Sequence, residues 1–206
     1  MCSPSWVNAR TAFREATAWF VRATASGHDR WDEQALGEWT VRDLVGHTSR
    51  ALLTVEAYLD QPVASIEVTS PIEYFRLALA SVGDPAAVAQ RGRDAGAQLG
   101  ADVAAAVEQI ADRVIGRVDA APEDAPVATP VGGMRLADYL PTRTFELTVH
   151  TCDLAAALGQ KADVPEVAAL DSLTLLGGLA VRSGRAGPLL LAATGRGNLP
   201  SGFTVL

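Results

Sequence analysis

Apolar side chains recur every three or four residues along most of this 206-residue chain, and this helical period constrains its fold more than any other feature. Leu44, Ala51, Val55 and Tyr58, for example, fall on one face of a single helix at that spacing. A second stripe of this kind runs through residues 99–118. The pattern is typical of amphipathic helices that bury one face against each other. We therefore predict a mainly α protein built as a helical bundle.

Capping signals set the ends of the predicted helices. Thr40 and Asp43 have the spacing of a capping box, in which each side chain bonds the other residue's backbone N–H. Asp84 is the expected N-cap of a long helix over residues 85–118, which we expect to bend near residues 96–100. The six predicted helices span approximately residues 4–26, 41–60, 71–80, 85–118, 136–158 and 165–182.

The remaining segments are predicted as loops and short strands. Residues 119–133 are rich in Pro, Ala and Gly and must cross the bundle, with an extended stretch at 127–131. Residues 188–206 are predicted as a short C-terminal β-hairpin, with strands at 188–194 and 203–206. A lone hairpin has marginal stability. We therefore expect it to pack on the bundle or on a second subunit.

Composition and charge narrow the class of protein. Apolar residues make up 49% of the chain and charged residues 20%, and no long linker is evident, which predicts one globular domain over residues 1–206. The net charge of −7 argues against nucleic acid or anionic membranes as partners, and no apolar run is long enough to span a bilayer. Two cysteines, Cys2 and Cys152, do not make a disulfide framework, so the expected location is the cytoplasm.

The stretch RTFELTVHTCD, residues 143–153, contains the strongest candidate site. Glu146 and His150 are four residues apart in a predicted helix and so share one face. His47 lies about a hundred residues upstream, on the apolar face of another predicted helix. If the two helices pack together, the three side chains form a pocket of two histidines and one carboxylate. Such a set suits zinc and similar divalent ions and leaves a coordination position open.

Each of these residues also has a simpler interpretation. A Glu–His pair at this spacing is often a solvated surface pair, and His47 could be a hydrogen-bonded core residue. Asp43 or Asp153 could orient a ligating imidazole, or serve only as a helix cap and a surface acid. Cys152 is most simply a small buried hydrophobe.

Four segments bear a family resemblance: GEWTVRDLVGH, DPAAVAQRGRDAGAQL, RTFELTVHTCDLAAALG and LAATGRGNLPSGFTVL. Together they make the chain resemble the mycothiol-dependent maleylpyruvate isomerase family, part of the DinB-like group of metal-binding four-helix bundles. The resemblance implies an up-down DinB-like bundle with a crossover. The family's metal ligands fall on His47, Glu146 and His150. A divalent metal, zinc first, and mycothiol as thiol cosubstrate are implied in the same way.

The isomerase that names the family carries a second, smaller C-terminal domain, whereas this sequence reaches only the predicted hairpin. We therefore expect thiol chemistry at a metal rather than that isomerisation itself. The expected function is that of a metal-dependent thiol S-transferase or isomerase-like protein, in which a metal-bound thiolate adds to an electrophilic small molecule. Arg143, one turn before Glu146, is the candidate catalytic residue that would meet an anionic group; the alternative is a surface arginine.

Two other functions remain open from the sequence. One is a non-catalytic bundle that binds a metal, a small ligand or a partner. The other is a metal-dependent hydrolase with water as the nucleophile. In the favoured case the partners are a low-molecular-weight thiol and a small electrophile, and we expect a homodimer.

Overall fold

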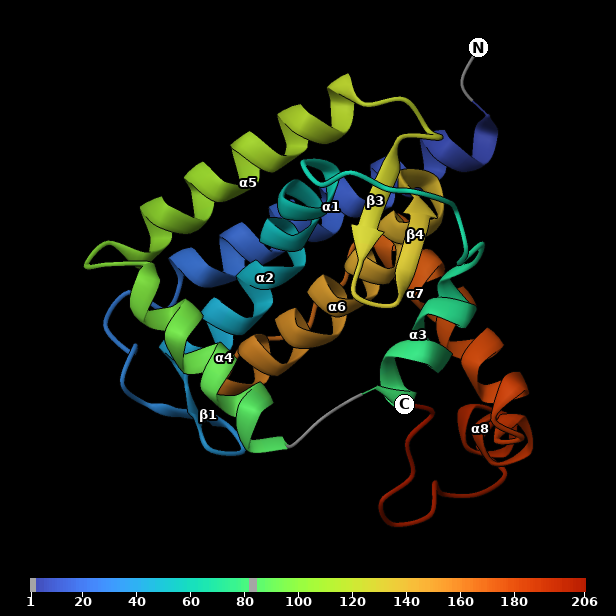
Figure 1. The fold of residues 1–206 in the computed structure, drawn as a ribbon. Helices are drawn as coiled ribbons and strands as arrows, with labels where there is room; N and C mark the ends of the chain where they lie inside the picture. Colours follow the sequence, from blue (N-terminus) through green and yellow to red (C-terminus); the bar gives the residue numbers. More distant parts are fainter. Residues whose placement is uncertain (1–2, 82–84) are drawn as a thin grey trace.

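The computed structural model describes residues 3–81 and 85–206, and within these ranges the chain is mainly helical (Figure 1). The described helices are α1 (Pro4–Ala25), α2 (Val41–Leu59), α3 (Pro71–Ala80), α4 (Pro85–Gln98), α5 (Val103–Ala120), α6 (Leu136–Ala157), α7 (Glu166–Arg182) and α8 (Ala186–Ala193). Two small antiparallel hairpins join them: β1 (Gln34–Leu36) with β2 (Trp39–Thr40), and β3 (Pro126–Thr129) with β4 (Gly132–Arg135). The mainly α fold class is confirmed.

Four long helices form the bundle. α1 packs on α5 and α6, and α2 packs on the same two helices, so that α1 faces α2 across one diagonal and α5 faces α6 across the other. The connection from α5 to α6 therefore crosses the bundle, as expected, and carries the β3–β4 hairpin. The core between the helices is apolar, and Phe13, Phe20, Leu52, Val107 and Leu147 are buried in it. α7 adds a further layer on α1 and α6.

α2 begins where the sequence predicts. The Thr40 backbone N–H donates to Asp43 Oδ2 at 3.0 Å, and the Asp43 backbone N–H donates to Thr40 Oγ1 at 3.2 Å. This capping box fixes the start of the helix that carries His47. Asp43 is therefore a capping residue.

The region 85–118 is two helices rather than one bent helix. Gly100 takes a positive φ of 73° after α4, a conformation that favours glycine and ends a helix. Asp102 then caps α5 by accepting a hydrogen bond from the Ala105 N–H at 3.0 Å. A new helix starts there because the chain supplies both a stop and a start within four residues. The predicted N-cap Asp84 lies outside the described residues.

The prediction of a hairpin at residues 188–206 is wrong. Residues 186–193 form α8, and the β-hairpin of this half of the molecule lies at 126–135, over the stretch expected to be extended. A short apolar run does not distinguish a strand from a helix by its period. Leucine and alanine, which fill this run, are strong helix formers.

α4 lies beside α2 (Figure 1), and glycines allow the two helices to approach each other closely. A methyl group on Gly46 of α2 would lie 2.1 Å from the backbone nitrogen of Gly96 in α4. Gly92, one turn before Gly96, faces the ring of Trp39 in the same way. Side chains of α4 are thereby placed over the face of α2 that carries His47.

The tail returns to the bundle after α8. Val205 is buried in the core cluster, and Phe203 packs against it.

No helix within residues 3–81 and 85–206 is long and apolar enough to cross a membrane.

Candidate metal centre

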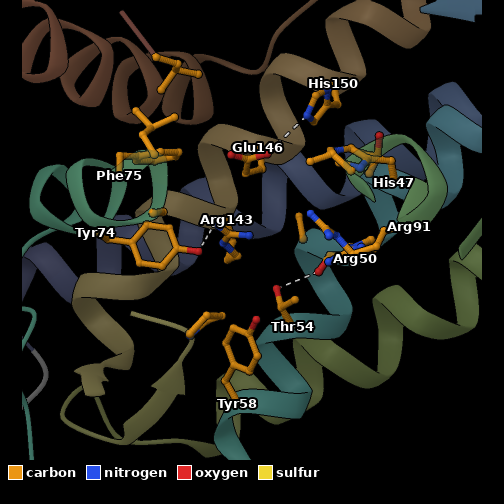
Figure 2. A pocket seen from close by; sticks show the side chains of 17 residues that line it. His47, Arg50, Thr54, Tyr58, Tyr74, Phe75, Arg91, Arg143, Glu146 and His150 are labelled. Atoms are coloured by element: carbon orange, nitrogen blue, oxygen red, sulfur yellow. Dashed lines mark hydrogen bonds and ion pairs between the residues drawn. The ribbon is translucent and has the colours of Figure 1, made fainter. Parts of the chain in front are cut away.

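His47, Glu146 and His150 come together between two packed helices, α2 and α6 (Figure 2). Each residue offers one potential ligand atom, and these atoms lie within 4.8 Å of one another. His150 Nε2 is 3.4 Å from Glu146 Oε2, and the rings of His47 and His150 meet edge to face with centroids 4.7 Å apart. Two nitrogens and one oxygen at this separation could bind one divalent ion.

A carboxylate fixes the orientation of His150. Its Nδ1 lies 3.1 Å from Asp153 Oδ2, which leaves Nε2 facing Glu146. Carboxylates behind metal-binding imidazoles commonly have this role, because they fix the ring and its tautomer. Of the two acids considered from the sequence, Asp153 is the one beside a site histidine.

His47 has a buried nitrogen without a partner. Its Nδ1 makes no hydrogen bond to any described residue, so the interpretation as a hydrogen-bonded core histidine does not hold for this atom. The ring packs against Trp39, with centroids 4.4 Å apart. Buried polar atoms are usually paired. The buried Nδ1 therefore lacks the partner that a structural core histidine would have, and the ring as a whole lies beside a second histidine and a carboxylate, as a site for a divalent cation requires.

The charges of the three groups are strongly coupled. Burial, and then the positive charge of His150, lower the pKa of His47 to about 4. Burial alone would raise the pKa of Glu146, but the hydrogen bond from His150 and the charge of Arg143 lower it to about 2. Burial alone would lower the pKa of His150, but its contacts with Asp153 and Glu146 raise it to about 9. Without a metal, His47 is neutral at pH 7 while Glu146 and His150 form an ion pair.

The cluster opens into a cavity of about 310 Å³. α3 contributes Tyr74 and Phe75, α4 contributes Arg91, and Leu206 reaches the cavity from the tail. The volume is at the lower end of the range for small-molecule sites. Figure 2 shows the site residues around this space.

Arg143 lies in the wall of the cavity and is only 8% exposed, so the alternative of a surface arginine is wrong. Its Nη2 donates to the Tyr74 hydroxyl at 3.3 Å, and its Nε donates to Thr142 Oγ1 at 3.0 Å. The guanidinium also lies over the rings of Tyr74 and Tyr139, 5.4 and 4.9 Å from their centroids. These neutral contacts hold the cation in place without cancelling its charge.

Sequence reasoning missed several residues of the cavity. Arg50, Thr54 and Tyr58 continue the face of α2 that carries His47, three, seven and eleven residues further on, so the helical period could have indicated them. Arg91 had no such signal, because only the packing of α4 on α2 brings it to the site.

The fold and the site place this protein in the class of helical bundles that have a cluster of two histidines and one carboxylate between their helices. Residues 10–155 match the family model described as the mycothiol maleylpyruvate isomerase N-terminal domain, and the chain belongs to this family. The matched region includes all three residues of the cluster. No curated protein and no solved structure matched the chain.

Proposed function

We propose that this protein is a metal-dependent thiol S-transferase that joins a low-molecular-weight thiol to an electrophilic small molecule. The convergence of His47, Glu146 and His150 at a cavity is the observation that supports it. Family membership makes mycothiol the proposed thiol. Zinc is the first candidate for the metal, because the donor set of imidazole and carboxylate suits it.

His47, Glu146 and His150 would hold the ion, and Asp153 would orient His150 from behind. The ion supplies Lewis acidity, which lowers the pKa of a thiol and makes it a nucleophile at neutral pH. At the electrophile, a carbon–sulfur bond forms and the π bond of an activated alkene breaks, while the neighbouring carbon takes up the thiol proton. If elimination follows rotation about the carbon–carbon bond, the same residues serve a cis–trans isomerase.

Arg143 is the proposed catalytic side chain beside the ligand set. Its position is fixed by Tyr74 and Thr142, and its pKa is raised by Tyr139, Tyr74 and Glu146 despite burial, so it stays charged throughout the working pH range. A fixed cation of this kind stabilises negative charge that develops on the electrophile when sulfur adds.

Metal analysis of the purified protein tests the site. We expect about one divalent ion per chain, and its loss in the double variant His47→Ala, Glu146→Ala. His28→Ala is the matched control, because His28 is exposed and lies outside the cluster. Equal and negligible metal in the wild type and the double variant would contradict the proposal.

Diethyl maleate with mycothiol tests the reaction, because its products separate the candidate functions. A thioether indicates S-transfer, diethyl fumarate indicates isomerisation, and half-ester formed without thiol indicates hydrolysis. We expect metal-dependent thioether formation that the double variant loses and the His28→Ala variant retains. A metal-loaded protein that forms none of these products favours the non-catalytic binding bundle instead.

A further inference from the structure

The outer face of α7 carries most of the highly exposed apolar side chains of the described residues. Leu170, Val181 and Leu173 are 68%, 67% and 63% exposed, and among the large apolar side chains only Leu190 of α8 is as exposed. With its opposite face α7 packs on α1 and α6 (Figure 1). The exposed fractions show that no described element covers the outer face.

This face forms a continuous uncharged stripe along the helix. Leu170, Thr174, Gly177 and Val181 recur every three or four residues and so share one side of α7. Asp171 is the only charged side chain between the two ends of the helix, and it lines a pocket at the start of α1 instead. The outer face of a solvated helix is normally polar or charged. An apolar stripe in that position is typical of a surface that another molecule covers.

Gly177 leaves an open position within the stripe. A methyl group added there would meet no atom within 4 Å. Leu173 and Val181, each four residues away, are exposed on either side of it. A large apolar side chain from another helix could fill this gap, because side chains of packed helices fit between one another. The stripe itself carries such a side chain, Leu170.

The two ends of α7 carry opposite charges without partners. Glu166 lies in the first turn and Arg182 in the last, and neither makes an ion pair within residues 3–81 and 85–206. Glu73 of α3 is near enough to Arg182 to sense its charge, but its ion pair is with Arg76, at 2.6 Å. Two antiparallel copies of α7 would bring the acidic end of each against the basic end of the other, whereas parallel copies would bring like charges together.

We propose that this face is a homodimer interface, in which two copies of α7 pack antiparallel about a twofold axis near Thr174. Thr174 is eight residues from Glu166 and eight from Arg182, so the acid of each copy lies near the arginine of the other. Leu170 of each copy then lies opposite the open position at Gly177 of the other. A twofold interface requires a surface that complements itself in this way.

A second copy suits the stripe better than a membrane surface does. Helices that lie on membranes carry Lys or Arg along their polar flanks. The basic residues of α7 are confined to its C-terminal end, and the chain has a net charge of −7.

The interface would leave the candidate metal centre accessible. No residue of α7 or α8 lines the cavity beside that centre. The dimer therefore goes beyond the proposed function and can be tested independently of it.

Sedimentation velocity of the full chain over a range of concentrations tests the interface. We expect a dimer that Leu173→Glu weakens about a hundredfold or more, because a twofold interface contains each substitution twice. Val7→Glu is the matched control, since Val7 is 52% exposed on α1, and it should dimerise as the wild type does. Both variants should keep the far-UV circular dichroism of the wild type. A monomer at every concentration, or a dimer that Leu173→Glu leaves intact, would overturn the proposal. So would equal weakening by the two variants.

Cross-linking tests the direction of the helices. A short bismaleimide should join two chains of Thr174→Cys, because the two copies of this position meet at the axis. It should not join two chains of Val181→Cys, whose copies would lie about 21 Å apart along antiparallel helices. The wild type controls for Cys2 and Cys152. Cross-linking of both variants would indicate parallel helices, and cross-linking of neither would place the interface elsewhere; each result contradicts the proposed arrangement.

Exchange of the end charges tests their pairing. Glu166→Arg and Arg182→Glu should each weaken the dimer severalfold, because each places like charges together. The double variant Glu166→Arg, Arg182→Glu should recover the affinity of the wild type. A double variant that dimerises no better than the two single variants would show that these ends do not meet.

Discussion

Asp153 and Glu146 contact opposite nitrogens of the His150 ring, and they have different roles at the site. Glu146 lies with the potential ligand atoms, whereas Asp153 reaches the far ring nitrogen. This arrangement gives one histidine two acidic neighbours. The ring of His47, in contrast, packs against the rings of Trp39 and His150.

Asp153→Asn should weaken metal binding about 10- to 100-fold, because the amide fixes the imidazole less well and makes it less basic. In the metal-free protein the same change should lower the pKa of His150, which its contacts with Asp153 and Glu146 raise to about 9. Calorimetry and an NMR titration of the ring measure the two effects. Asp163→Asn, an exposed acid beside Lys161, is the control and should change neither.

Metal affinity should rise with pH up to about 9. Below that pH the metal-free protein holds a proton on His150, and the ion must displace it. His47, with its pKa lowered to about 4, is already neutral and adds no dependence near neutral pH. We expect about a tenfold gain in affinity per pH unit between pH 7 and 8.5 for one displaced proton. Titrations in buffers of different ionisation enthalpy count the proton, and an affinity independent of pH would contradict the assignment.

Glu146 and His150 could be predicted from their spacing alone, because the period of one helix places both on the same face. Assigning His47 to the same site required knowing that two helices about a hundred residues apart in the sequence pack together. The family resemblance indicated this. The burial of Arg143 could not be predicted, since neither spacing nor charge indicates that Tyr74 and Tyr139 surround it.

At the scale of elements, the contact between α2 and α4 depends on glycines. Gly46→Ala should destabilise the protein by about 1–3 kcal/mol, because its methyl group would overlap the backbone of α4 at Gly96. Urea unfolding measures the free-energy change. Gly116→Ala in α5 is the control: no atom lies within 4 Å of the added methyl, so the helix should gain up to about 1 kcal/mol.

A Gly46→Ala protein as stable as the wild type would show that α4 does not pack as closely on α2 as described.

The element boundaries show where the sequence is ambiguous. The cap at Thr40 could be predicted because its signal is local and complete. The break between α4 and α5 was underestimated, because glycine tolerates both a bend and a full stop. The helix α8 was mistaken for a strand because its eight residues offer no polar positions from which to read a period.

At the scale of the whole molecule, the tail connects the last helices to the candidate site. The side chain of Val205 is 9% exposed in the core cluster, and Leu206 lines the cavity. Val205→Ala should therefore reduce the free energy of unfolding by about 1–3 kcal/mol. Val181→Ala in α7, where the side chain is 67% exposed, is the matched control and should stay within about 0.5 kcal/mol. Equal effects of the two variants would show that the tail is not docked.

The association state is a separate prediction at this scale. We expect a homodimer, and sedimentation velocity of the purified protein measures it. Leucines of α7 and α8 are exposed, among them Leu170, Leu173 and Leu190. Leu170 and Leu173 lie one turn apart in α7, and exposed apolar patches are typical of surfaces that another molecule covers.

One of the four tryptophans, Trp39, lies directly against the candidate metal centre, with its ring tilted by 33° to that of His47 and the two centroids 4.4 Å apart. Imidazole quenches indole emission by an amount that depends on its own charge and ligation. The intrinsic fluorescence of this protein should therefore change when an ion arrives, without any label. A variant that keeps only Trp39 would then report occupancy of the centre in real time, in solution and at nanomolar protein.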